Sequence, residues 1–416
     1  MARMASSTVV KFPAAFRHLA WANLAAQSAE QISLAAVPMI AVLTLGAGAG
    51  ETGMLAAAQT LPFLLLSIPA GIAADRHSRK HLIVAAEAIR AVALLALVLL
   101  VMTGQTSIAW LAVLGFLGAA GTVAFSVAAP ALVPGLVGPD ALAAANGRLE
   151  LARSAAFAAG PALAGALVAW AGASSAFVLA TVLSVLALVL LRRVTPPPQH
   201  MAPRRHVLRE LREGAGFVWH HPLLRPIALT TVAWNLAWFV LQAVYVPYAV
   251  RTLGLDTAGI GNTLAAYGIG LVSGSMLAPR LLNRLRFGTA TLVGPIVSVL
   301  AALVMLATVW QPSGWLAGVA FFLFGAGPPL WTVAQITLRQ TVTPGPLLGR
   351  VSALYMTASA GARPIGAAVG GLVGDQFGLA ACLGLAAAGF VVQAGVIVFS
   401  PLPALARLPR AVATAP

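Results

Sequence analysis

Apolar runs of membrane-spanning length recur along the whole chain, separated by short segments rich in proline, glycine and charge. A helix that crosses a bilayer needs about 20 mainly apolar residues. The chain contains twelve such runs, at about 14–44, 52–74, 82–103, 107–134, 146–170, 174–191, 226–250, 257–282, 289–309, 314–342, 348–373 and 379–400. The pattern therefore predicts an all-α membrane protein with twelve transmembrane helices.

The basic residues indicate how these spans are oriented. All but four of the 25 lysines and arginines lie at the amino terminus, in the tail, in the even-numbered loops or within a few residues of those loops. The exceptions are Arg251 in an odd-numbered loop and Arg90, Arg153 and Arg363 inside spans. Because basic loops stay on the cytoplasmic side, both termini are predicted to be cytoplasmic.

Composition excludes several classes of protein. The chain is 60% hydrophobic and 8% charged, with a mean hydropathy of +0.93, whereas soluble domains are about 25% charged. Soluble enzymes, disordered proteins and nucleic-acid modules are excluded on this ground. The net charge of +15 reflects membrane orientation, so no nucleic-acid partner is expected.

Motifs for nucleotide hydrolysis and metal binding are missing from the sequence. The only lysines are Lys11 and Lys80, and no GxxxxGK[ST] motif is present, so the chain has no P-loop of its own. The histidines lack ligand spacing with cysteine or carboxylates. We expect no enzymatic activity, cofactor or metal, and uphill transport would depend on an ion gradient.

The longest hydrophilic stretch divides the chain into two halves. It contains a basic segment with helical spacing of apolar residues, which predicts an amphipathic helix on an anionic membrane surface. The predicted organisation is a six-helix half at 1–191, a cytoplasmic linker at 192–225, a second six-helix half at 226–400 and a tail at 401–416.

The two halves resemble each other in sequence. Segment 139–167 is similar to 344–372, with Gly147-Arg148 matching Gly349-Arg350 and Pro161 matching Pro364. Two parallel halves related by an axis along the membrane normal are typical of one class of secondary transporter.

Specific motifs resemble those of a known family. GIAADRHSRK (71–80) is similar to the loop signature of the major facilitator superfamily. AFAAGPALAG (156–165) resembles the antiporter signature of its exporters, with Gly160, Pro161 and Gly165 matching and alanine replacing two glycines. FRHLAWANLAAQSAEQ (16–31) and LAAANGRLELARS (142–154) resemble the branch of enterobactin and macrolide exporters. The resemblance implies two pseudo-symmetric six-helix halves and proton-coupled antiport.

The resemblance also implies that the loop after the second span gates the cytoplasmic side. In the family, its aspartate pairs with neighbouring spans in one state and releases them in the other. The matching residues are Asp75, Arg76, Arg79 and Lys80. Anchoring by positive charge would explain the basic residues but not the carboxylate.

Two acid–base pairs stand at i, i+3 within spans. They are Glu87–Arg90 and Glu150–Arg153, and residues at this spacing neutralise each other on a helix. Both pairs are expected toward the cytoplasmic ends of their spans, in a structural or gating role.

Glu30 is the candidate proton-coupling residue. It lies deep in the first span, with Asn23 and Gln27 on the same helix face. A carboxyl in hydrocarbon is unfavourable, so it should face a central cavity. The alternative is a structural hydrogen bond to another helix.

Arg363 is a deep arginine with no acidic residue within a helical turn. It must find a counter-charge inside the bundle, either a carboxylate such as Glu30 or an anionic substrate. The protein partner is favoured.

The remaining cavity candidates are aromatic and amide side chains. Four of them form a stripe at helical spacing in the seventh span, and two lie in the tenth. They are Trp234, Trp238, Gln242, Tyr245, Trp331 and Gln335. Aromatics near span ends also occur as interface belts.

These features predict an inner-membrane exporter of small amphiphilic molecules, drug-like or siderophore-like, working by proton antiport as the two halves rock. The partners are a small-molecule substrate, protons and the lipid bilayer. A lysophospholipid flippase of the same fold is an alternative. A non-transporting receptor or scaffold is a weaker one, because it would be expected to carry an appended soluble domain.

Overall fold

The computed structural model describes residues 12–138, 141–195 and 207–409, and in this part of the chain all regular structure is helical. The elements are α1 (Ala14–Leu45), α2 (Ala49–Arg76), α3 (Arg79–Met102), α4 (Ile108–Leu136), α5 (Leu142–Ala171), α6 (Ala173–Arg192), α7 (Val207–His220), α8 (Leu224–Arg251), α9 (Thr257–Arg284), α10 (Phe287–Ala307), α11 (Gly314–Ala326), α12 (Pro328–Val342), α13 (Gly345–Gln376), α14 (Leu379–Val398) and the 3-10 helix η2 (Leu402–Ala404).

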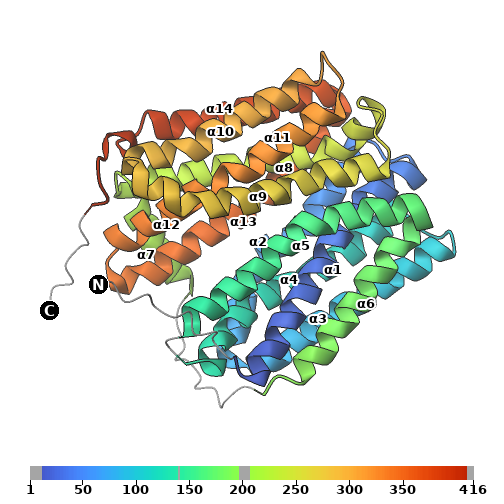
Figure 1. Cartoon of the computed structure of the whole chain (residues 1–416), viewed down its shortest axis with the longest axis horizontal. Coiled ribbons are helices and arrows are strands. Elements are labelled where there is room, and N and C mark those ends of the chain that lie inside the picture. Colours follow the sequence, from blue (N-terminus) through green and yellow to red (C-terminus); the bar gives the residue numbers. More distant parts are fainter. Residues whose placement is uncertain (1–11, 139–140, 196–206, 410–416) are drawn as a thin grey trace, which may run out of the picture.

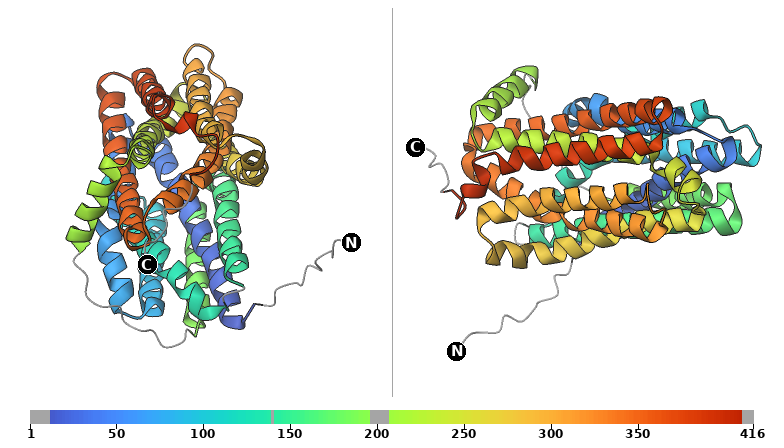
Figure 2. Two further views of the ribbon diagram at one scale, coloured as in Figure 1. Left: turned by 90° about the vertical axis from the view of Figure 1, so that its left-hand side faces the viewer. Right: turned by 90° about the horizontal axis from the view of Figure 1, so that it is seen from above.

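The helices form two bundles that lie side by side. Helices α1 to α6 make one bundle and α8 to α14 the other, as Figure 1 shows. Seen from above, the long helices of both bundles run roughly parallel (Figure 2). The fold is therefore an all-α membrane fold built from two helical halves.

The linker contains the helix α7, which packs on α8 and α13. Glu213 of α7 forms an ion pair with Arg350 in the second turn of α13. A Cβ on Gly214 would lie 2.9 Å from the backbone carbonyl carbon of Arg350, so the two helices touch closely. The preceding linker segment 196–206 and the end of the predicted tail, 410–416, lie outside the described residues.

Among the described residues, ten spans are apolar enough to cross a membrane by length and composition, one of them the stretch Gly314–Val342. Two further helices are long enough but more polar: α9 has 28 residues and α13 has 32. These two pack against α5 and α2 of the other half. Several of their glycines therefore pack against protein, and the apolar requirement on these helices is relaxed.

The predicted tenth span, 314–342, is not one continuous helix. It is divided into α11 and α12 at Gly327, and α12 begins with Pro328 and Pro329. Proline has no amide hydrogen to donate, so it interrupts the backbone hydrogen bonds of a helix and is best accommodated in a first turn.

The halves touch closely toward the ends of the spans remote from α7, here called the closed end. A Cβ on Gly53 of α2 would lie 2.3 Å from the Cα of Gly371 in α13. A Cβ on Gly165 of α5 would lie 2.9 Å from the Cα of Gly261 in α9. Only glycine permits backbones to approach this closely.

Candidate functional site

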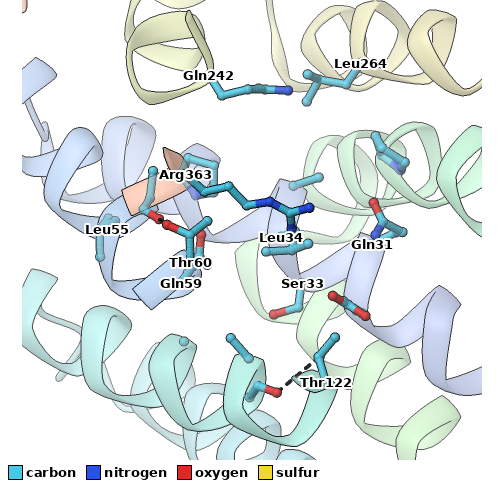
Figure 3. Close-up of a pocket in the computed structure, with 18 of the residues that line it drawn as sticks. Gln31, Ser33, Leu34, Leu55, Gln59, Thr60, Thr122, Gln242, Leu264 and Arg363 are labelled. Carbon is cyan, nitrogen blue, oxygen red and sulfur yellow. Dashed lines mark hydrogen bonds between the residues drawn. The ribbon is translucent and has the colours of Figure 1, made fainter. Parts of the chain in front are cut away.

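A cavity of about 300 Å³ lies between the two halves. Its walls come from α1 to α5 on one side and from α8, α9, α11 and α13 on the other. Figure 3 shows amide and hydroxyl side chains projecting into it among apolar ones. The charged residues in its lining are Glu30, Arg90 and Arg363. A cavity of this size, mostly apolar with a few polar groups, is suited to binding a small organic molecule.

Glu30 lines the cavity from α1 and is half-buried. The charged side chains that act on it electrostatically are those of Arg90, Glu87, Arg363 and Arg153. It has no ion-pair partner among the described residues. Of the two polar residues predicted to flank it, Asn23 donates to the backbone carbonyl of Leu149 at 3.1 Å, and Gln27 lies outside the cavity lining. The Glu30 carboxyl is thus the acidic group that the amino-terminal half presents to the cavity.

Arg90 is held by several partners within the amino-terminal half. Its guanidinium pairs with Glu87 at 3.2 Å, and both side chains are almost fully buried. It also donates to the carbonyl of Ala26 and to the Thr122 hydroxyl, each at 3.0 Å. Ser184 of α6 donates to the second carboxylate oxygen of Glu87. These contacts connect α1, α3, α4 and α6.

This location differs from the expectation for Glu87 and Arg90, which placed them toward the cytoplasmic end of their span. Arg90 is near the middle of α3, a helix of 24 residues, and it faces the cavity. The other predicted pair, Glu150–Arg153, is an ion pair whose side chains are 58% and 43% exposed. The same i, i+3 spacing therefore gives a buried network in α3 and an exposed surface pair in α5.

Arg363 does not form the predicted ion pair with Glu30. Its guanidinium carbon lies 5.2 Å from the centre of the Phe63 ring and 5.8 Å from that of Phe239. Its Nε is buried and has no hydrogen-bond partner in the described part of the chain. Phe63 belongs to α2 and Phe239 to α8, so cation–π contacts to both halves take the place of a carboxylate.

The aromatic stripe of the seventh span is only partly at the cavity. Trp238 and Gln242 line it. Trp234 stacks on Trp238 with ring centres 5.4 Å apart, and its indole nitrogen donates to Ser298 at 3.2 Å. Tyr245 is fully buried and hydrogen-bonded to Thr263. Trp234 and Tyr245 therefore pack behind the residues that line the cavity.

The two candidates of the tenth span also lie outside the lining. Trp331 of α12 is buried in a separate apolar cluster with Leu338 and Tyr355. Gln335 has a buried side-chain oxygen that lacks a partner among the described residues. The break after α11 explains this, because α11 reaches the cavity through Phe321 while α12 continues beyond it.

The glycine–proline motif of α5 brings three helices together. Pro161 lines the cavity. A Cβ on Gly160 would lie 2.5 Å from the Cβ of Gln31 in α1, and Gly165 contacts α9 at the closed end. The motif thus packs α5 against α1 and against the other half.

The predicted gating residues stand at the ends of two helices, where the sequence suggested a longer loop. Asp75 and Arg76 belong to the last turn of α2, while Arg79 and Lys80 open α3. The side chain of Asp75 lies outside the described residues, and Arg79 donates to the carbonyl of Ala74 at 3.4 Å.

Arg251, the basic residue in an odd-numbered loop, bridges the halves at the closed end. It donates to the backbone carbonyls of Gly46 and Ala47 at 3.2 and 2.9 Å. An arginine therefore ties the end of α8 to the loop between α1 and α2.

Several cavity residues were not predicted from the sequence. Gln59 and Thr60 are a polar pair inside the second span, and the reasoning applied to Glu30 would have found them. Phe63 and Phe239 carry no such signal, because phenylalanine is common at any position of a membrane helix.

Comparisons with known proteins agree with this geometry. The family model described as Major Facilitator Superfamily matches residues 19–367. A relative in Citrobacter koseri, "Enterobactin exporter EntS", is 31% identical over 268 residues, which are 63% of this chain and 62% of that protein. The chain thus matches less than two thirds of this relative's length.

Solved structures with little sequence identity share the fold. A bacterial homologue of the iron transporter ferroportin in its inward-facing state is 18% identical, with a TM-score of 0.73 over 92% of this chain and 98% of that one. The outward-facing state of such a homologue gives a TM-score of 0.62 at the same identity and coverage.

Proposed function

Because the chain belongs to the Major Facilitator Superfamily, we propose that it exports small amphiphilic molecules across the bacterial inner membrane in exchange for protons. It is a multi-pass membrane transporter, and the proposal concerns direction, coupling and substrate. The name of the relative in Citrobacter koseri supports export. The basic residues between spans support an orientation with both termini in the cytoplasm.

The observation that carries the proposal is Glu30 in the wall of a cavity shared by both halves. A carboxyl at this depth can exchange a proton with whichever side the cavity opens to. If a substrate cation and a proton compete for it, inward movement of a proton drives outward movement of the substrate. This one-for-one exchange of cations moves no net charge, so the pH gradient drives it and provides about 1.4 kcal/mol per pH unit.

Alternating access is supported by the asymmetry of the contacts between the halves. The glycine contacts and Arg251 hold the closed end together. Rocking the halves would part the closed end and bring the ends of α2 and α3 against the other half. Asp75, Arg76, Arg79 and Lys80 would then act as the cytoplasmic gate.

The test uses everted membrane vesicles with an acidified interior and a dye that is quenched by the pH gradient. Addition of a transported aromatic amine should collapse part of the gradient and restore fluorescence. Glu30→Gln should abolish this response, because the side chain can no longer release a proton. Arg192→Gln, at the exposed end of α6, is the control and should respond as the unaltered protein does.

A response that persists in Glu30→Gln would show that another group carries the proton. Transport of a lysophospholipid that is independent of the gradient would instead favour a flippase.

A further inference from the structure

Two opposite charges face the cavity without neutralising each other. Glu30 projects from α1 and Arg363 from α13. No carboxylate oxygen of Glu30 comes within ion-pair distance, 4.0 Å, of the Arg363 guanidinium, and no other ion pair of either residue occurs in the part of the chain that is described. The third charge of the lining, Arg90, is already neutralised by Glu87.

The surroundings of Arg363 leave hydrogen-bonding capacity free. The two phenylalanine rings contact the guanidinium but accept no conventional hydrogen bond, and its Nε is buried without a partner. In Figure 3 the side chain extends across the cavity toward Leu34 of α1. An acidic group of a ligand is the partner that a guanidinium fits best, since two parallel hydrogen bonds can form.

The cavity that contains these two charges has aromatic walls. Trp238, Phe239 and Tyr267 line the cavity from the carboxyl-terminal half, and Trp238 stacks on Tyr267 with ring centres 4.8 Å apart. Phe63 and Phe157 line it from the other half. Flat aromatic ligands pack well against such rings.

We infer that the preferred substrates are zwitterionic aromatic compounds, with a cationic group at Glu30, an acidic group at Arg363 and a planar ring between them. The inference rests on the proposed function for its direction of transport, but it concerns binding alone. A ligand with both charges neutralises each wall of the cavity, whereas a singly charged ligand leaves the opposite wall charge unpaired and desolvated.

The zwitterion is also compatible with proton antiport. The groups that act on Glu30 are Arg90 and Glu87 on α3, Arg363 on α13 and Arg153 on α5. An acidic ligand group at Arg363 offsets the positive charge there, and the ammonium group then competes with the proton for Glu30. Binding should therefore release protons.

The test is calorimetric titration of the purified protein with three ligands that share one ring. They are 6-(aminomethyl)-2-naphthoate with both charges, 6-methyl-2-naphthoate with the acid alone and (6-methyl-2-naphthyl)methylammonium with the cation alone. The unaltered protein should bind the zwitterion about tenfold or more tightly than either single ion, since charged hydrogen bonds contribute about 1.5–3 kcal/mol.

Each variant should remove one half of this preference. Arg363→Gln should bind the zwitterion no more tightly than the cation, and Glu30→Gln no more tightly than the anion. Titration in buffers of different ionisation enthalpy should show proton release with the zwitterion in the unaltered protein and none in Glu30→Gln. Arg192→Gln removes the same charge outside the cavity and should leave all three affinities unchanged.

Equal affinities for the three ligands in the unaltered protein would overturn the inference, as would an undiminished zwitterion preference in both cavity variants. Retained binding of the cation by Arg363→Gln shows that the variant is folded. Because no gradient is applied, zwitterion binding without proton-driven transport would refute the proposed antiport and leave the binding inference intact. Proton-driven transport without a preference for the zwitterion would refute the binding inference and leave the proposed antiport intact.

Discussion

Arg90 and Arg363 both present a guanidinium to the central cavity, but their surroundings differ in kind. Arg90 has a carboxylate at 3.2 Å, a backbone carbonyl and a hydroxyl at 3.0 Å. Arg363 has two aromatic rings and no ion pair or hydrogen bond in the described part of the chain, whereas on Arg90 only the Nε lacks a partner. The hydrogen-bonded region around Arg90 belongs to one half of the protein, and the aromatic region around Arg363 spans both.

This difference indicates that the charge of Arg90 stabilises the fold, whereas the charge of Arg363 is available to a ligand. The partners of Arg90 lie on helices of the same bundle, so they move with it when the halves rock. Phe63 and Phe239 lie on opposite bundles, so the surroundings of Arg363 change with conformation. A buried cation that is paired with a carboxylate stabilises the fold, whereas one without a carboxylate partner can bind an acidic ligand.

The largest effect is expected from Arg90→Gln. The substitution leaves the Glu87 carboxylate, which is fully buried, without its cation, and loss of one partner of a buried pair costs about 3–5 kcal/mol. The unfolding midpoint of the detergent-solubilised protein should fall steeply, and the double variant with Glu87→Gln should recover much of the loss.

Arg153→Gln is the matched control, because it removes an arginine from a pair of the same spacing whose side chains are exposed. Exposed pairs of this kind contribute about 0.3–0.5 kcal/mol. Similar losses of unfolding free energy in the two variants would show that the buried contacts of Arg90 stabilise the fold no more than an exposed ion pair does.

An intermediate effect is expected from Gly53→Ala. The new Cβ would lie 2.3 Å from the Gly371 Cα, and overpacking of this kind costs about 1–3 kcal/mol. The closed end should part more often, moving Phe63 away from Arg363 while the Arg90 network stays intact. Labelling of Ala56→Cys by an impermeant maleimide from the closed end, in a Cys382→Ala background, should accelerate about fivefold or more.

Gly384→Ala serves as the control for this experiment, since a Cβ at Gly384 would meet nothing within 4 Å. An unchanged labelling rate in Gly53→Ala would mean that the contact between α2 and α13 does not hold the closed end.

The smallest effect on stability is expected from Arg363→Gln. The variant loses two cation–π contacts, about 0.5–1 kcal/mol each at exposed sites and more when desolvated, and is relieved of a buried charge that favours water. The net change in unfolding free energy should be below about 1 kcal/mol. Combination with Glu30→Gln should be additive within about 0.5 kcal/mol. If Arg363→Gln instead loses much unfolding free energy and the double variant with Glu30→Gln regains it, the two residues form the ion pair that was predicted from the sequence.

The fold could be predicted from the sequence because length and hydropathy define each span locally. The apolar run at 107–134 became α4 with its ends displaced by two residues or fewer. The division at Gly327 was missed because the stretch Gly314–Val342 as a whole is apolar enough to count as one span, although the sequence shows Pro328 and Pro329. A break in a helix depends on backbone donors, which hydropathy does not measure.

The site could be predicted only in part. The sequence indicates how deep a residue lies along its span, but not which neighbouring helix its side chain faces. Counting residues placed Glu30 and Arg363 within the bundle, and both line the cavity. Their partners depend on how helices distant in sequence are rotated against each other. The pairing of Arg363 with Glu30, which the sequence favoured, is absent from this structure for this reason.

The modest hydropathy of α9 and α13 has a consequence for how the chain is inserted during synthesis. A nascent helix enters lipid readily only when its own side chains favour lipid. These two helices find a suitable environment against α5 and α2, which are synthesised earlier. The first bundle would then act as a template on which the second is completed, and a chain started at α8 should leave both helices poorly inserted.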